Sequence, residues 1–124
     1  MKTSRQRRVG ALDGRGRGVV IEQELGPPAA GQVLVEVRAS LISPGTELGG
    51  VSALRAKPDP ARAPRPFGYA NAGVVREVGE GVAQFGPGAR VACMGAGYAQ
   101  HADLALVPQN LCVPIPSGVD FESA

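Results

Sequence analysis

Hydrophobic and polar residues alternate along much of the chain in short runs, a pattern typical of β-strands that bury one face. The clearest run is residues 31–40, GQVLVEVRAS, which places Val33, Val35 and Val37 on one face and Leu34, Glu36 and Arg38 on the other. This period of two predicts a half-buried strand whose valines face the core. Similar runs predict strands at residues 7–12, 18–25, 69–78, 90–94, 98–107 and 111–116.

Turn-forming residues separate these strands. Asp13-Gly14-Arg15-Gly16 lies between the first two runs and predicts a hairpin. Residues 57–66 contain four prolines, which remove backbone donors and restrict the residues before them. This segment is therefore predicted to be an exposed loop.

Two segments carry helix-start signals. Residues 47–56, ELGGVSALRA, predict a short helix with Thr46 as its N-cap. Near the end of the sequence, Asp120 is a candidate N-cap with Ser123 at the third helical position.

Seven short strands at roughly ten-residue spacing predict a mainly β domain, either a small barrel or a sandwich. A chain of 124 residues has the size of one domain. Hydrophobic residues make up 44% of it but aromatic residues only 4%. Small and β-branched side chains must therefore fill the core.

The net charge is only +2, which does not by itself favour nucleic acid as a partner. Basic residues are concentrated in the first eighteen positions, where they form either a solvated terminus or an arm that binds an anion or a nucleic acid. No aromatic residues are interleaved there for base stacking, so we favour the solvated terminus. With no apolar run of transmembrane length and no signal peptide, we expect a cytoplasmic protein that binds neither nucleic acid nor a membrane.

Cys93 and Cys112 lie nineteen residues apart and form no CxxC motif. We interpret both as small buried residues in strands. His101 is the only histidine in the sequence and is interpreted as a core or surface residue of its strand. Two cysteines and one histidine are a poor ligand set, so no metal is expected.

Closely spaced glycines raise the question of a phosphate-binding loop. Dinucleotide binding requires G-x-G-x-x-G between a strand and a helix. Gly79-Glu80-Gly81, Gly95-Ala96-Gly97 and the glycines of residues 14–18 all lack this context. We interpret these glycines as turn and bulge residues, and we expect no cofactor-binding residue in this chain.

Four segments in order, GQVLVEVRAS, SPGTEL, PFGYANAGVVREVGEGVAQFGPGARVA and GYAQHADLALVPQNLCVPIPSGVDFESA, carry a family resemblance. They resemble the N-terminal, GroES-like catalytic domain of the medium-chain dehydrogenase/reductase family, in its alcohol-dehydrogenase-like branch. The resemblance runs from about Arg7 to Ala124, which leaves residues 1–6 as a basic tail. It implies a partly open β-barrel with one or two short helices.

The resemblance also implies a C-terminal Rossmann domain that binds NAD or NADP. That domain is absent from this sequence, so we expect the 124-residue chain to be inactive alone. Any homo-oligomer is expected to need the Rossmann domain as well.

Zinc-dependent members of this family carry Gly-His-Glu where this chain reads Gly68-Tyr69-Ala70. They also carry a zinc-binding cysteine in a segment that here reads SPGTE, where the matching position is either Ser43 or Pro44. Neither residue is a thiolate, and no four-cysteine lobe is present. The resemblance therefore implies a zinc-independent type.

Without zinc, hydrogen-bond donors must stabilise an oxyanion. The candidate catalytic donors are the hydroxyls of Thr46, Tyr69 and Ser43 and the amide of Asn71. Each has a structural alternative: Thr46 caps a helix, Tyr69 fills the cleft, and Asn71 satisfies a backbone group.

Two functions follow from this reasoning. The first is the substrate-side domain of a zinc-independent NAD(P)-dependent oxidoreductase that acts on a small-molecule carbonyl, alcohol or activated double bond. The second is a free-standing GroES-like barrel that serves as a binding or assembly module, or an inactive fragment. The segment DFESA starts a helix at the end of the sequence, which favours the first.

Overall fold

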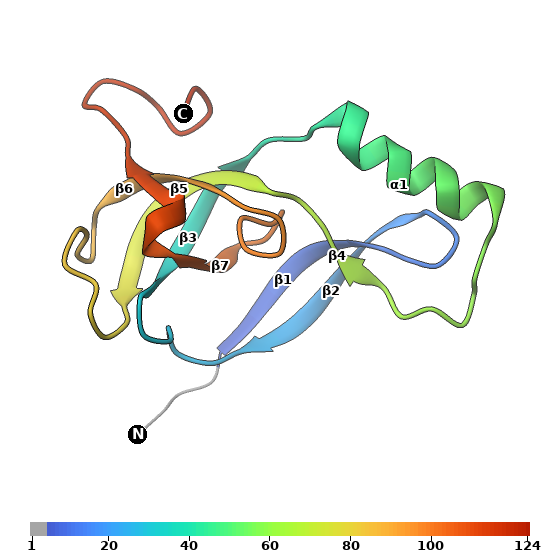
Figure 1. Ribbon diagram of the computed structural model, residues 1–124, viewed down its shortest axis with the longest axis horizontal. Coiled ribbons are helices and arrows are strands. Elements are labelled where there is room, and N and C mark those ends of the chain that lie inside the picture. Colours follow the sequence, from blue (N-terminus) through green and yellow to red (C-terminus); the bar gives the residue numbers. More distant parts are fainter. Residues whose placement is uncertain (1–4) are drawn as a thin grey trace.

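A long central strand organises the larger of two antiparallel sheets in the computed structural model, which describes residues 5–124 (Figure 1). The strands are β1 (Arg5–Leu12), β2 (Gly18–Leu25), β3 (Gln32–Ser40), β4 (Arg65–Pro66), β5 (Ala70–Val78), β6 (Arg90–Met94), β7 (Leu104–Pro108) and β8 (Cys112–Pro114). The helix α1 spans Pro44–Ala56, and a 3₁₀ turn spans Gln109–Leu111.

The larger sheet has the strand order β7-β3-β5-β6-β8, and the smaller has the order β2-β1-β4. An isolated bridge between Val9 and Ala102 connects β1 to the segment before β7. The two ladders do not close into one continuous sheet among the described residues. The predicted mainly β, partly open barrel is confirmed. No helix in this part of the chain is both long and apolar enough to span a membrane.

Small aliphatic side chains fill the core, as the composition predicts. The buried cluster consists of Val33, Val35, Val75, Phe85, Val91, Cys93, Ala99, Ala105, Val107 and Cys112. Burying one valine fully stabilises the fold by roughly 1.5–3 kcal/mol. Five of the members are valines on four adjacent strands, so the sheet is stabilised by many small contacts.

The strict alternation predicted for residues 31–40 is wrong at one position. Leu34 was expected on the polar face but is fully buried. The register between β3 and β5 shifts at this point, since Leu34 pairs with Glu77 and Val35 with Val75. One extra residue of β5 forms a bulge there. The bulge lies in β5 and leaves the side-chain alternation of β3 intact, so Leu34 is buried because the second face of β3 is covered as well.

The helix begins earlier than predicted, and Ser43 rather than Thr46 occupies the N-cap position. Pro44 is the first helical residue, where the fixed φ of proline suits a helix. The backbone N–H of Glu47 donates to the carbonyl of Ser43 (2.9 Å), and the Ser43 N–H donates to the Glu47 carboxylate (3.3 Å). The helix ends just before Pro58, which disfavours a helical conformation at Lys57.

Three other predicted elements differ in detail. The strand predicted at 98–107 begins only at Leu104, because residues 98–103 form turns and bends. The predicted loop at 57–66 ends in the two-residue strand β4, which pairs with β1. Near the end of the chain, the N–H of Ser123 donates to the Asp120 side chain (2.7 Å), which confirms the predicted capping contact within a turn.

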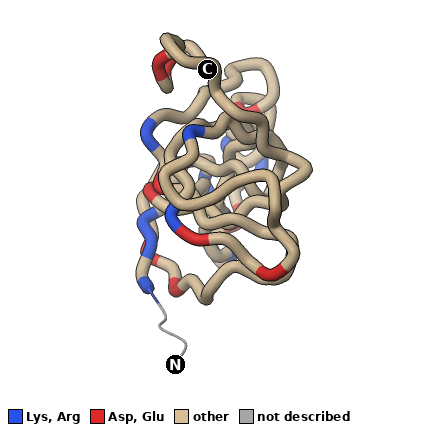
Figure 2. The backbone as a smooth tube through the Cα atoms, turned by 90° about the vertical axis from the view of Figure 1, so that its left-hand side faces the viewer, with Lys and Arg blue, Asp and Glu red and all other residues tan. Residues whose placement is uncertain are grey.

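Basic side chains of the first strand have partners within the domain. Arg7 is buried and donates to Gln23 (2.7 and 3.1 Å), to Gln100 (2.9 Å) and to the carbonyl of Leu104 (3.3 Å). Burial lowers the pKa of the Arg7 guanidinium, and the Asp103 carboxylate opposes this effect. Arg5 forms an ion pair with Glu77. Figure 2 accordingly shows basic and acidic positions side by side along this part of the backbone. Residues 1–4 of the predicted basic tail lie outside the described part.

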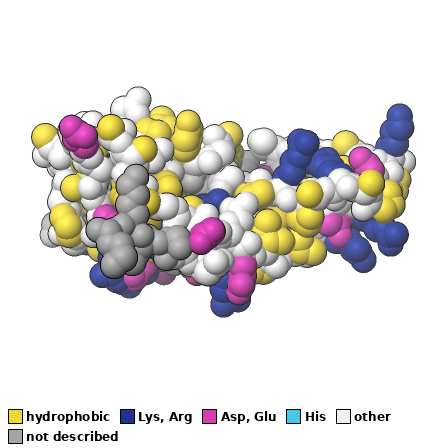
Figure 3. Space-filling view, turned by 90° about the horizontal axis from the view of Figure 1, so that it is seen from below, with side chains coloured by type: hydrophobic (Ala, Val, Ile, Leu, Met, Phe, Trp, Pro, Cys, Tyr) yellow, Lys and Arg dark blue, Asp and Glu magenta, His cyan; other side chains and the backbone are white. Residues whose placement is uncertain are grey.

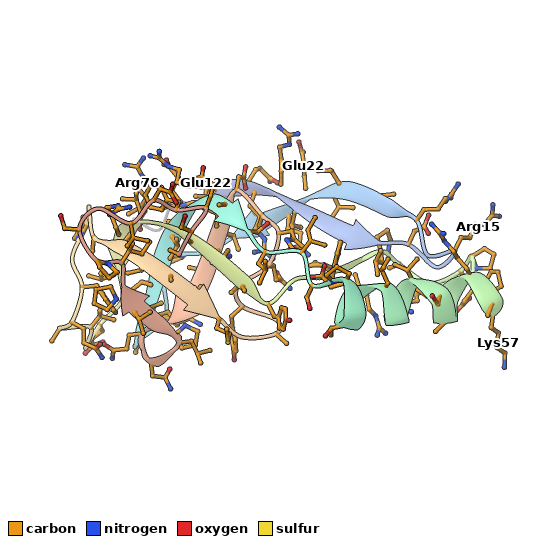
Figure 4. All side chains as sticks on the ribbon, turned by 90° about the horizontal axis from the view of Figure 1, so that it is seen from above. Arg15, Glu22, Lys57, Arg76 and Glu122 are labelled. Carbon is orange, nitrogen blue, oxygen red and sulfur yellow. The ribbon has the colours of Figure 1, made fainter. Side chains whose placement is uncertain are left out.

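The helix lies beside the turn of the β1–β2 hairpin, away from the larger sheet (Figures 1 and 4). Figure 4 shows Arg15 of the turn and Lys57 after the helix at the same end of the molecule. The N–H of Asp59 donates to the carbonyl of Gly14 (2.8 Å), which links the segment after α1 to the predicted hairpin turn. No residue of α1 is buried, so its position depends on a few specific contacts.

Gly73 is the point of closest approach between β3 and β5. A Cβ added there would lie 2.0 Å from the carbonyl oxygen of Glu36 and 2.9 Å from a methyl carbon of Val35. We therefore expect Gly73→Ala to lower the free energy of unfolding by about 1–3 kcal/mol or more through overpacking. Urea denaturation measures this. Gly49→Ala is the matched control, because its Cβ meets nothing within 4 Å and should stabilise α1 by up to about 1 kcal/mol. Equal stability of the two variants would contradict the close approach.

Candidate functional site

Three segments that are distant in sequence meet where the β3–β5 ladder ends. Ser40, the last residue of β3, pairs with Asn71 of β5. The N–H of Leu41 donates to the carbonyl of Ala70 (2.9 Å), and the N–H of His101 donates to the carbonyl of Phe67 (3.1 Å). The N-terminal turn of α1, the start of β5 and the loop before β7 therefore surround one region.

His101 lies at the centre of this region, and its ring nitrogens contact the end of β3 and the first turn of α1. Its Nδ1 lies 2.7 Å from the Ser40 hydroxyl, and its Nε2 lies 2.8 Å from the Glu47 carboxylate. The side chains of His101 and Glu47 are only 13% and 10% exposed. The three residues form a continuous hydrogen-bonded chain, which we call the Ser40–His101–Glu47 chain.

The surroundings fix the orientation of the imidazole. The Phe67 ring packs edge-on against it with the ring centroids 4.9 Å apart. Gly68 has φ +108°, and a Cβ added there would lie 2.8 Å from the Cδ2 atom of His101. Only glycine suits this conformation and this distance. The backbone at 67–68 therefore forms one wall of the histidine site.

The sequence did not identify this arrangement. His101 was expected to be a core or surface residue within a strand, but it lies in a bend and has two side-chain partners. Ser40 and Glu47 were not candidates at all. Two local features could have drawn attention to these residues. Glu47 lies four residues after Ser43 at a predicted helix start, and His101 follows the glycine-rich turn at 95–97.

The four predicted site residues have different surroundings. Asn71 is buried, and its Nδ2 donates to the carbonyl of Gln100 (2.9 Å), whereas its Oδ1 has no partner among the described residues. Ser43 lies at the N-cap and makes no side-chain capping bond. Tyr69 is half-buried and Thr46 is exposed, and neither forms a side-chain hydrogen bond within residues 5–124. Only Asn71 of the four lines a hollow described below.

Three hollows adjoin this region. The apolar cleft has a volume of about 740 Å³, and its lining includes Ser40, Asn71, Cys93, Met94, Leu111 and Phe121. The helix-side hollow, about 490 Å³, is lined by residues that include Glu47, Leu48, Phe67 and His101. The charged hollow, about 470 Å³, includes Arg8, Asp103 and His101. Ser40 contributes to all three.

The surface near these hollows combines apolar and basic side chains. Leu41, Ile42 and Leu48 are largely exposed around the start of α1. Figure 3 shows Lys and Arg side chains gathered at the end of the molecule where Figure 1 places α1 and the hairpin turn. Hydrophobic side chains lie between them.

The two cysteines form a pair inside the larger sheet. Cys93 and Cys112 are register partners on β6 and β8, both are buried, and their sulfur atoms lie 3.7 Å apart. The hydrogen bond with Cys112 and burial raise the pKa of the Cys93 thiol. Their interpretation as small buried strand residues is confirmed.

The donor set of the region does not fit a catalytic zinc. Such a site needs three protein ligands of the Cys, His, Asp or Glu type. Within residues 5–124, no group of three or more such side chains lies close enough together to hold a metal. The glycines of residues 14–18, 79–81 and 95–97 lie in the connections between strands or, for Gly18, at the start of β2, and no described helix follows them directly.

Comparison with known proteins identifies the fold family. Residues 29–117 match the model of the alcohol dehydrogenase GroES-like domain. The chain is 32% identical over 94 residues to the quinone oxidoreductase of Rattus norvegicus, and the match covers 76% of this chain but 28% of the rat protein.

Solved structures share the same fold. A protein from Rhizobium etli CFN 42 that is named as a zinc-dependent alcohol dehydrogenase superposes with a TM-score of 0.70 at 24% identity, over 94% of this chain and 35% of its own. A variant of the crotonyl-CoA carboxylase/reductase AntE, in complex with NADP, superposes with a TM-score of 0.72 at 20% identity, over 94% and 38%. The chain thus spans little more than a third of these relatives.

The order of strands, the helix after β3 and the match over residues 29–117 lead to one assignment. The chain belongs to the alcohol dehydrogenase GroES-like domain family, the N-terminal domain of the medium-chain dehydrogenase/reductases.

Proposed function

We propose that this chain is the substrate-side domain of a zinc-independent, NAD(P)-dependent oxidoreductase that acts on a carbonyl, an alcohol or an activated double bond. The observation that carries the proposal is the donor set beside Ser40 and Asn71, which consists of hydroxyl, amide and imidazole groups. No thiolate and no cluster of three metal ligands belongs to it among the described residues. The quinone oxidoreductase relationship and the fold supply the reaction class.

The apolar cleft is the proposed location of the substrate. Its lining is mainly apolar, so an apolar carbonyl compound such as a quinone binds there with little desolvation cost. The Oδ1 atom of Asn71, buried and without a partner in residues 5–124, offers an acceptor to a donor group of the bound molecules.

A bound nicotinamide supplies or accepts the hydride. The residues of this chain then have to stabilise the charge on the substrate oxygen. We assign that role to the hydroxyls of Tyr69 and Thr46, with Ser43 and the Asn71 amide as further donors, because they lie in the two segments where the resemblance implies the metal of zinc-dependent relatives. Of these four residues Asn71 lines the apolar cleft, so the role of the other three requires that the complete protein brings the substrate oxygen within their reach. Oriented donors of this kind act without a metal ion.

Zinc analysis tests the metal-independent part of the proposal. We expect the protein, purified and dialysed without chelator, to contain far less than one zinc per chain by elemental analysis. Treatment with 1,10-phenanthroline should leave the activity of the complete protein unchanged. About one bound zinc per chain would contradict the proposal.

Cofactor titration tests where the nicotinamide binds. The 124-residue chain has no dinucleotide fingerprint, so we expect its NADPH affinity to be no tighter than about millimolar, near −4 kcal/mol. The complete protein should bind at least tenfold more tightly in the same calorimetric titration. Micromolar binding to the 124-residue chain would mean that one of its glycine turns holds a phosphate.

Removal of the two hydroxyls tests their catalytic role. We expect Tyr69→Phe and Thr46→Val to lower kcat of the complete protein by roughly 100- to 1000-fold, which corresponds to about 2.7–4 kcal/mol, with less effect on KM. Thr46 is not the helix cap, so its replacement should leave the melting temperature nearly unchanged.

Tyr98→Phe is the matched control, since Tyr98 is 42% exposed and lies outside the three hollows. It should retain wild-type turnover. If Tyr69→Phe and Thr46→Val also retain it, both hydroxyls are structural.

A further inference from the structure

The Ser40–His101–Glu47 chain joins side chains from three separate elements by two short hydrogen bonds. Ser40 ends β3, Glu47 lies in the first turn of α1, and His101 lies in the loop before β7. Both ring nitrogens of His101 are occupied, so the imidazole connects a hydroxyl to a carboxylate. Serine, histidine and a carboxylate in this order can pass a proton.

The chemistry of the three groups fixes the direction of each hydrogen bond. An ionised carboxylate only accepts, so Nε2–H of His101 donates to Glu47. In the neutral imidazole Nδ1 is then an acceptor, and the Ser40 hydroxyl donates to it. When His101 carries a second proton, Nδ1–H donates to the Ser40 oxygen instead. The hydroxyl proton of Ser40 is then free to point away from the ring.

The position of Ser40 determines where that proton can go. Ser40 is exposed and lines the apolar cleft beside Asn71, and it also lines the helix-side hollow together with His101 and Glu47. His101 also lines the charged hollow, which is open to solvent and contains Arg8 and Asp103. Arg55 is the other charged group that lines the helix-side hollow with His101 and Glu47. The Ser40–His101–Glu47 chain thus adjoins both the apolar cleft and the charged hollow, which is open to solvent.

We infer that the Ser40–His101–Glu47 chain is a proton relay that delivers the proton required when a substrate carbonyl in the apolar cleft is reduced. The inference rests on the proposed function, whose nicotinamide supplies the hydride. As the hydride bonds to the carbonyl carbon, the π electron pair moves to the oxygen, which takes the hydroxyl proton of Ser40. Ser40 takes the Nδ1 proton of His101, and the imidazole becomes neutral. One proton from solvent, which reaches Nδ1 through the Ser40 hydroxyl at the charged hollow, then restores the imidazolium.

A purely structural role is the alternative explanation. Because α1 has no buried residue, the Glu47–His101 contact also holds the helix in place. A structural contact predicts changes in stability only. A relay predicts one defined tautomer of His101. It also predicts that replacing either Ser40 or His101 lowers turnover.

The tautomer is measured on the 124-residue chain, which needs no cofactor. His101 is the only histidine, so ¹⁵N-histidine labelling gives one assigned pair of ring signals. We expect the neutral ring to carry its proton on Nε2, with Nδ1 in the range of a hydrogen-bonded acceptor. Ser40→Ala should move the Nδ1 signal and leave Nε2 in place. Glu47→Gln should produce a mixture of tautomers, whereas the control Ser52→Ala, on the exposed face of α1, should change nothing.

Turnover is measured on the complete protein with NADPH and 1,4-naphthoquinone as the probe. We expect Ser40→Ala and His101→Gln each to lower kcat about 10²- to 10⁴-fold, the usual contribution of proton transfer. The double variant should be no slower than the slower single variant, because the two residues act as one unit. Ser52→Ala should match the wild type. Melting curves monitor folding.

The outcomes separate the relay from the proposed function. A ring proton on Nδ1, or an Nδ1 signal that Ser40→Ala does not move, would overturn the relay. A folded Ser40→Ala protein with wild-type turnover would also overturn it while leaving the oxidoreductase intact. A complete wild-type protein that oxidises no NADPH with 1,4-naphthoquinone would overturn the proposed function. In that case the spectra of the cofactor-free chain would still show whether the Ser40–His101–Glu47 hydrogen bonds exist.

Discussion

The ladder between β3 and β5 is the constraint on which the rest of the structure depends. These are the two longest strands of the larger sheet, and they contribute Val33, Val35 and Val75 to the buried cluster. Their bulged register brings Ser40 opposite Asn71 at the end from which both α1 and the connection to β4 leave. The sheet core and the candidate site therefore depend on the same strand pairing, and a shift of one residue would reverse both.

Local conformations at the end of this ladder complete the site. Gly68 allows the backbone to pass close to the imidazole, and Pro44 starts the helix so that Glu47 lies in its first turn. The helix is held by contacts to the hairpin turn and to His101, since it buries none of its own side chains. The first turn of α1 contacts His101 through Glu47, so the proposed relay and the position of this end of α1 are physically linked.

The sequence predicted most of the fold but little of the site, because the two depend on different information. Strands such as β2 and β6 were predicted at their observed bounds, since alternation and turn residues are local signals. The buried position of Leu34 was missed, because distant segments determine whether the second face of a strand is covered. The contacts of His101 were missed for the same reason: its partners lie 61 and 54 residues away, and nothing in its local sequence specifies them. The strand expected at 98–107 also suggested, wrongly, that His101 lies within a strand and pairs with a neighbouring one.

The positions at which the family resemblance implies a zinc-binding histidine and a carboxylate carry other residues here. Tyr69 and Ala70 replace the expected histidine and carboxylate, yet a histidine and a carboxylate still meet nearby, contributed by the loop before β7 and by α1. Both ring nitrogens of His101 have hydrogen-bond partners, and no third side chain of a metal-ligand type lies close to this pair among the described residues. The pair can, however, hold and pass a proton. If the reaction proceeds without a Lewis acid, the charge on the substrate oxygen has to be neutralised by a proton as it forms, and a hydroxyl backed by an imidazole and a carboxylate is a chemical means of doing so.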